Sequence, residues 1–170
     1  MILKSFELEK INKKINKLIL FYGKNEGLKN NAINNLIKNK DGISCYDEKE
    51  ILDNSNTFIE NILTKSFFES EKNIIIKRAS DKILKIIDEI NTKSLDNLII
   101  IINADSLEKK SKLRSFFEKD KKCVSVAFYP DTEQTLSKLA YNFLKGKNIS
   151  ISQANINLIV NKCNADRETL

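Results

Sequence analysis

The segment from Gly23 to Asn30 has the layout of a phosphate-binding loop. An apolar run over 18–22 ends at Gly23, and a helical pattern begins at Leu28. Chains with the pattern G-x-x-x-x-G-K-[ST] use such a strand, turn and helix to hold nucleotide phosphates. Lys29 is in frame, but Leu28 replaces the second glycine and Asn30 replaces the hydroxyl residue. Because a phosphate needs close backbone approach and magnesium needs the hydroxyl, we expect a degenerate loop that does not bind ATP.

The expected strand over 73–77 lacks the acidic residues at its end that ATP hydrolysis requires. In phosphate-loop ATPases, carboxylates in this part of the sheet hold the metal ion and activate the attacking water. The corresponding run here, 73–78, ends in Lys77 and Arg78. These cations would repel magnesium and supply no general base. The sequence therefore predicts no cofactor, no metal site and no catalytic residue.

The composition argues against several other kinds of site. The 170-residue chain has no histidine, the commonest general base and metal ligand. Its three cysteines are far apart and give neither zinc spacing nor a disulfide framework. It has no run of about eighteen apolar residues and no basic-apolar leader, so we expect a cytoplasmic protein. The net charge of +6 permits nucleic-acid binding, but Lys, Asn and Ile share A/T-rich codons, so charge alone identifies no partner.

Strands and helices alternate along the first 130 residues. The expected strands are 18–22, 43–46, 73–77, 98–102 and 123–128. The expected helices are 28–38, 57–63, 81–90 and 111–118, with Ser80 as the N-cap of the third. Continuous apolar runs indicate strands buried on both faces. The sequence therefore predicts an α/β fold, a five-stranded parallel sheet with helices on both faces, and function at the carboxyl ends of the strands.

The pattern changes at Pro130, the only proline. Helical stretches follow over 132–145 and 152–163, and Asp166 could cap a third helix. We expect residues 1–130 to form the α/β domain and residues 131–170 to begin a small all-helical lid domain. Since the chain stops about one turn into the third helix, we also expect it to be an N-terminal fragment of a longer protein.

The order of these parts resembles an AAA+ module, and in particular the N-terminal half of the delta subunits of bacterial DNA polymerase III clamp loaders. The residues that carry this resemblance are 20–26, 63–69 leading into 74–76, 98–107 and 132–144. It implies a non-catalytic holoenzyme subunit that does not bind ATP and that binds and opens the sliding clamp, the beta subunit, in DNA replication. It also implies the gamma or tau and delta prime subunits and primed DNA as partners, no membrane contact, and a collar domain beyond residue 170.

The resemblance assigns clamp binding to Ser66, Phe67 and Phe68. The two rings are adjacent, flanked by Lys65 and Glu69, and lie between a helix end and a strand start, where alternation cannot easily bury both. Leaving one ring exposed forfeits roughly 1.5 to 3 kcal/mol of burial, so two exposed rings would suggest a binding anchor. On the residues alone, rings that cap the core are the other interpretation.

A denser cationic stretch starts the helix after the fourth strand. It consists of Lys109, Lys110, Lys112 and Arg114. The resemblance implies that this face can approach the template-strand backbone, where cations would give salt-dependent affinity. A solvated helix face is the alternative. Asn103 matches the nucleotide-sensor position of ATP-binding relatives, but without nucleotide it is expected to end a strand and cap the following turn.

Two other functions stay open. Gly23 and Lys29 would suit a nucleotide-binding ATPase with an atypical phosphate loop, which thermal stabilisation by Mg-ATP would reveal. The basic charge would suit a general nucleic-acid-binding α/β protein. That chain would be expected to carry a surface aromatic ladder for stacking on single strands, and the sequence shows none.

Overall fold

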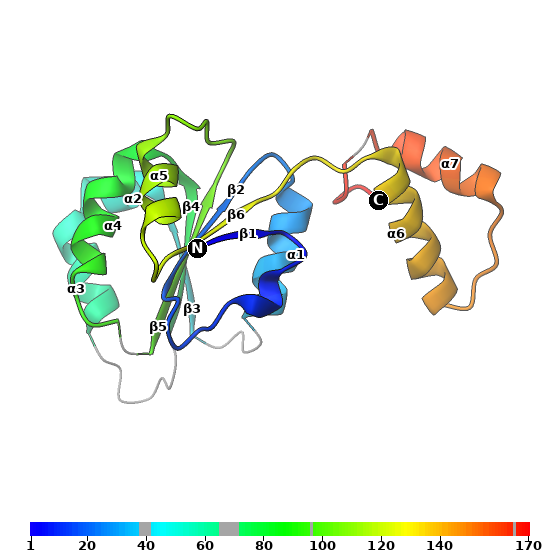
Figure 1. Cartoon of the computed structure of the whole chain (residues 1–170). Coiled ribbons are helices and arrows are strands. Elements are labelled where there is room, and N and C mark those ends of the chain that lie inside the picture. The colour runs from blue at the N-terminus through cyan, green and yellow to red at the C-terminus, as the bar shows by residue number, and fades with distance from the viewer. Residues whose placement is uncertain (38–41, 65–71, 96, 165) are drawn as a thin grey trace.

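A parallel sheet forms the centre of the molecule (Figure 1). The computed structural model describes residues 1–37, 42–64, 72–95, 97–164 and 166–170. The strands are β1 (Ile2–Lys4), β2 (Leu18–Tyr22), β3 (Ile43–Asp47), β4 (Lys72–Ala79), β5 (Leu98–Ala104) and β6 (Val124–Ala127). They lie in the order β1-β6-β2-β5-β4-β3, and neighbouring strands pair in parallel. The predicted α/β class is therefore confirmed.

The predicted number of strands is wrong, because the sheet has six strands and not five. The additional strand, β1, pairs with β6 at the edge of the sheet, with Ile2 opposite Ser125. Only the middle one of its three residues, Leu3, is buried. So short a segment gives no periodic signal, and pairing with the neighbouring strand selects its extended form.

The described parts of the chain contain seven α-helices. They are α1 (Glu26–Leu36), α2 (Glu48–Asp53), α3 (Ser55–Leu63), α4 (Leu84–Asn91), α5 (Lys112–Lys119), α6 (Glu133–Gly146) and α7 (Gln153–Lys162). Sequence periodicity did not predict α2, which a capping box between Asp47 and Glu50 starts. Ser80 caps a short 3-10 turn that leads into α4, since its hydroxyl accepts the N–H of Lys82.

Helices cover both faces of the sheet (Figure 1). Alternate strand residues point to opposite sides: Ile19 and Phe21 pack towards α1, whereas Leu18 and Leu20 face α2 to α5. The central strands β2 and β5 are buried along their whole lengths. This double burial explains their continuous apolar sequences and brings the carboxyl ends of the strands to one edge of the domain.

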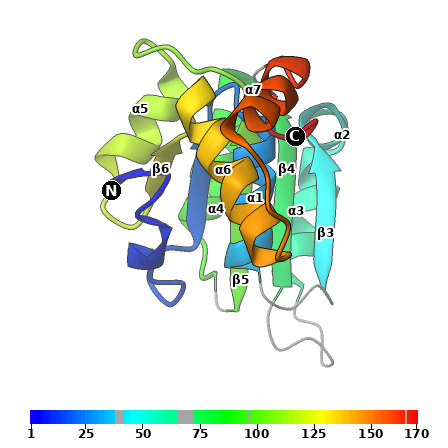
Figure 2. The same ribbon diagram turned by 90° about the vertical axis from the view of Figure 1, so that its right-hand side faces the viewer.

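Helices α6 and α7 form a small unit on the α1 side of the sheet (Figure 2). Its core consists of Leu136, Ala140, Ile156 and Val160. Beyond α7, residues 166–170 form a turn rather than a helix, in which the Asp166 carboxylate accepts the N–H of Glu168 at 3.1 Å. No helix within the described residues is long and apolar enough to cross a membrane.

Candidate functional site

The phosphate-loop segment adopts the predicted strand, turn and helix. Asn25 caps α1, since its side-chain Oδ1 accepts the N–H of Leu28 at 2.9 Å. Gly23 has a φ of +127°, a conformation that favours glycine. The backbone that follows β6 passes directly over it: a Cβ atom at Gly23 would lie 2.1 Å from the carbonyl oxygen of Phe128. The turn is therefore packed against the protein's own backbone.

The side chain of Lys29 is held in the interior of the protein. It is fully buried, and its Nζ donates a 2.7 Å hydrogen bond to the carbonyl oxygen of Ala104 at the end of β5. It also forms a 2.5 Å ion pair with the carboxylate of Glu26, which is half exposed. The other carboxylate oxygen of Glu26 accepts a 3.2 Å hydrogen bond from the side-chain amide of Asn103. An ammonium held in this way ties α1 to the sheet and points at protein acceptors.

The start of α1 is covered by the C-terminal segment of the chain. A Cβ atom added at Gly27 would lie 2.9 Å from the side chain of Glu168 and 3.3 Å from that of Arg167. Asn30 donates from its side-chain amide to Glu168 at 2.6 Å. Anions bind at the exposed N–H groups of helix N-termini, and here the side chain of Glu168 packs against the first turn of the helix.

A buried ion pair fixes this cover. The Arg167 guanidinium donates to both carboxylate oxygens of Asp131, at 2.6 and 2.7 Å, and Asn25 adds a 2.8 Å hydrogen bond to the same carboxylate. The Asp131 side chain is 6% exposed and the Arg167 side chain 15%. Arg167 holds the pKa of the Asp131 carboxyl below its usual value, with smaller contributions from Asn25 and Thr135. We call these three residues, Asn25, Asp131 and Arg167, the lid clasp.

The carboxyl end of β4 carries cations, as the sequence indicated. Lys77 and Arg78 are exposed on an irregularity of the β4–β5 ladder, and Arg78 has a positive φ of 54°. Arg78 forms an ion pair with Asp47 at the end of β3. Together with Glu26 and Asn103, these cations line a pocket of about 340 Å³ between α1 and the strand ends. Two carboxylates of this edge, Glu26 and Asp47, are thus each paired with a cation of the protein itself.

The other predicted site residues lie elsewhere. Lys109, Lys110 and Lys112 are exposed around the start of α5. Arg114 is half-buried: it bonds Glu118 at 2.7 Å and lies 5.0 Å from the ring centroid of Tyr22. Asn103 lies within β5 and bonds Glu26 rather than capping the turn after the strand. The predicted clamp-binding residues Ser66, Phe67 and Phe68 lie outside the described residues.

Sequence reasoning missed the lid clasp. Asn25 precedes a helix and could have been recognised as an N-cap. Asp131 directly follows Pro130, and Arg167 follows a potential capping residue, so each has a local interpretation that hides the tertiary contact. No spacing rule connects residues 36 positions apart, and only the folded chain brings them together.

Comparisons with known proteins agree on the fold. No protein-family model and no curated protein matches the sequence. The solved structure of the Bacillus subtilis DNA clamp loader delta protein (YqeN) matches 97% of this chain with a TM-score of 0.65 and 15% identity. This chain spans about half of that protein, 54% of its length. Domain III of the Thermotoga maritima replication initiation protein DnaA matches 92% of this chain and 72% of its own length, with a TM-score of 0.55 and 16% identity. The predicted AAA+-like fold is confirmed.

Proposed function

We propose that this chain is the non-catalytic delta subunit of a DNA polymerase III clamp loader, acting in the cytoplasm to bind and open the sliding clamp. One observation carries the proposal: within an AAA+-like fold, the phosphate-loop lysine, Lys29, is buried against Ala104 and Glu26. The packing of Arg167 and Glu168 against Gly27 supports it, because both features engage the loop in contacts with the protein itself.

The mechanism that follows is one of differential binding. A protein without its own ATP chemistry can open a ring only by binding the open form more tightly than the closed form. ATP is then handled by neighbouring gamma or tau subunits, and the delta prime subunit and primed DNA complete the assembly. The chain contributes a folded scaffold and a binding surface, and residues 1–130 form the clamp-binding part in this proposal.

We assign the clamp contact to Ser66, Phe67 and Phe68. These residues lie between α3, which ends at Leu63, and β4, which starts at Lys72. Paired aromatic rings in a desolvated pocket are typical binding hot spots, and truncation of such residues costs about 2 kcal/mol or more each. The Phe67→Ala, Phe68→Ala double variant should therefore lose at least about 100-fold in clamp affinity.

The test is calorimetric titration of the chain with the sliding clamp of the same organism. The matched control is a Phe6→Ala, Phe143→Ala variant, because both of these rings are exposed, at 75% and 63%, and neither belongs to the assigned segment. Circular dichroism checks the fold of each variant. Tight wild-type binding that only the first variant loses supports the assignment. Equal losses in both variants would refute it, and a folded wild-type chain without affinity would refute the proposed function.

The ATPase alternative has a separate test. If the loop bound Mg-ATP, ligand at 100 times the dissociation constant would stabilise the fold by about 2.7 kcal/mol and raise Tm measurably. We expect no shift, since Lys29 is occupied. A clear upward shift would replace the proposal with a nucleotide-binding function.

A DNA-backbone contact remains a prediction for Lys109, Lys110 and Lys112. Arg114 is not included now, because its guanidinium already bonds Glu118 and the carbonyl of Leu107. Phosphate contacts release counterions, so binding of a primed DNA would weaken steeply with salt. Affinity that is independent of salt, or unchanged when the three lysines are replaced by glutamine, would exclude this contact.

A further inference from the structure

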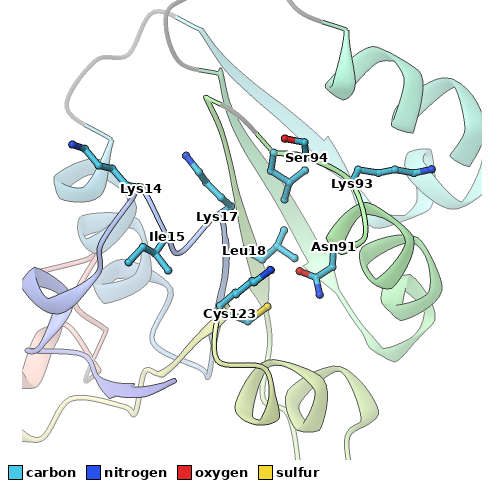
Figure 3. A pocket seen from close by; sticks show the side chains of 10 residues that line it. Lys14, Ile15, Lys17, Leu18, Asn91, Lys93, Ser94 and Cys123 are labelled. Carbon is cyan, nitrogen blue, oxygen red and sulfur yellow. The ribbon is translucent and has the colours of Figure 1, made fainter.

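A lysine-rimmed pocket lies at the opposite edge of the sheet from the phosphate loop (Figure 3). Its volume is about 360 Å³, within the range of small-ligand pockets. It opens where three segments approach the amino ends of β2, β5 and β6. Ten described residues from the segments 14–18, 91–95 and 122–123 line it.

The rim of this pocket is cationic. Lys14 and Lys93 lie on opposite sides of it, with Lys17 and Leu18 between them (Figure 3). The fourth lysine is Lys122, just before β6. Among the described residues, no carboxylate forms an ion pair with any of these four ammonium groups. The concentration of like charge is therefore available to an anionic ligand.

Asp120, two residues before Lys122, already accepts hydrogen bonds from the protein. Asp120 accepts the backbone N–H of Lys122 at 2.7 Å and the side-chain amide of Asn91 at 3.0 Å. These hydrogen bonds, with the Lys122 backbone contact first, lower the pKa of its carboxyl. Asp120 thus links Asn91 to the backbone of Lys122, and both of these residues line the pocket.

The floor of the pocket is apolar. Its accessible apolar surface comes from Ile15, which is 59% exposed, and from the partly buried Leu95, while Leu18 and Cys123 in the same lining are almost wholly buried. Burial raises the pKa of the Cys123 thiol to about 12, so the sulfur stays protonated and behaves as a small apolar group. None of the ten described lining residues is aromatic, so the pocket offers no surface on which a nucleic-acid base could stack. A cationic rim over an aliphatic floor suits an acidic peptide that carries an aliphatic side chain.

The pocket adjoins the start of β4. The backbone N–H of Lys72, the first residue of β4, donates at 2.8 Å to the carbonyl of Asn97, in the loop that follows Leu95. Three residues separate Phe68, in the segment that we assign to clamp binding, from Lys72 in the chain. The two proposed contacts are therefore close in sequence.

We propose that this pocket receives an acidic segment of the sliding clamp, with an aliphatic side chain against Ile15 and Leu95 and carboxylates at the lysine rim. The inference rests on the proposed function and names a second contact of the same partner. Charges at the rim of an interface chiefly raise the association rate and confer salt dependence, with a moderate effect on affinity.

The experiment is calorimetric and kinetic titration of the chain with the clamp, at low and at physiological salt. The test variant is Lys14→Glu, Lys93→Glu, Lys122→Glu, three residues that are exposed in the structure. The control, Lys49→Glu, Lys85→Glu, Lys138→Glu, makes the same change in net charge at exposed lysines outside the pocket. A corresponding Lys→Gln triple variant serves if charge reversal impairs folding, which circular dichroism would detect.

We expect the pocket variant to lose about tenfold or more in affinity, with a smaller salt dependence, and the control to lose less than about threefold. Equal losses in the two variants would overturn the inference, while wild-type binding would leave the proposed function standing. No wild-type binding would overturn both. If the pocket variant kept its clamp affinity but lost affinity for a labelled oligothymidylate, the occupant would be nucleic acid and the acidic-segment proposal would be wrong.

Discussion

Lysine side chains lie at both edges of the sheet, but their surroundings differ. At the carboxyl edge, Lys29 is buried and bonded to Ala104 and Glu26. At the amino edge, lysines such as Lys14 and Lys93 stand around a pocket without a described carboxylate partner. A buried charge needs partners within its own protein, because leaving it unpaired away from water is costly. An exposed charge is solvated and can bind a ligand. The lysine of the sequence motif is thus already paired within the protein, whereas the lysines around the amino-edge pocket have no described carboxylate partner.

The largest loss of stability is expected at Gly23, where the packing at the carboxyl edge of the sheet is tightest. Gly23→Ala would place a Cβ atom 2.1 Å from the Phe128 carbonyl at a φ of +127°. Backbone strain and steric overlap together should cost about 4 kcal/mol of unfolding free energy. Urea denaturation measures this, and Gly146→Ala, which meets nothing within 4 Å, is the matched control. Equal stability of the two variants would contradict the packing described for Gly23.

The lid clasp should contribute the next largest effect. Asp131→Ala leaves the Arg167 guanidinium without its carboxylate in a largely buried position, a change that costs about 3 kcal/mol. Limited proteolysis in the chain around Pro130 should also become faster, because α6 and α7 lose their fixed contact with α1. Unchanged proteolysis together with unchanged urea stability would show that the clasp does not hold the two parts together.

The clasp also predicts a pH dependence. Because the pKa of Asp131 is lowered in the folded state, mainly by Arg167, its contribution to stability is complete above the ordinary carboxyl pKa near 4. That contribution is lost as the pH falls from there through the lowered value. The gap in unfolding free energy between wild type and Asp131→Asn should therefore narrow below about pH 4. A gap that is constant from pH 7 to pH 3 would argue against the ion pair.

Lys29→Met is expected to have a moderate effect. Methionine keeps most of the buried volume, but the Ala104 carbonyl loses its hydrogen-bond donor, which costs about 1 to 2 kcal/mol. The half-exposed Glu26 carboxylate can turn to water. Thermal denaturation measures the change, and an absence of any Mg-ATP effect on Tm in both proteins would agree with a structural lysine. A Tm rise with Mg-ATP in wild type alone would mean that Lys29 serves a nucleotide.

The smallest change in stability is expected for the lysines around the amino-edge pocket. Lys14→Gln or Lys122→Gln removes an exposed charge without a described ion-pair partner, so the unfolding free energy should change by less than about 0.5 kcal/mol. Relief of repulsion between neighbouring lysines could make the change slightly favourable. A loss above about 1 kcal/mol in either variant would show that the amino-edge lysines are structural after all, and the difference between the two edges would disappear.

Sequence patterns predicted the interior of the sheet well. Continuous runs such as 98–102 could only be strands buried on both faces, and the structure extends this one to Ala104. The edge strand β1 and the short helix α2 were missed because three and six residues do not complete a reliable period. Their conformations depend on pairing with β6 and on the capping box at Asp47.

The candidate site was predictable only in part. Residue types alone showed that Leu28, Asn30, Lys77 and Arg78 do not suit phosphate and magnesium chemistry. Residue types could not show what fills the site, because Arg167 and Asp131 meet through the folding of distant segments. The same holds for the lysine pocket, whose rim gathers residues from three separate loops that have no common motif.

The backbone of Phe128 crossing over Gly23 has one more consequence. Here the glycine is a spacer between two stretches of main chain, and any side chain would separate them. Backbone packing alone is then enough to require a glycine at this position, whether or not the loop binds a nucleotide. The first glycine of the motif is therefore no evidence of what the protein binds.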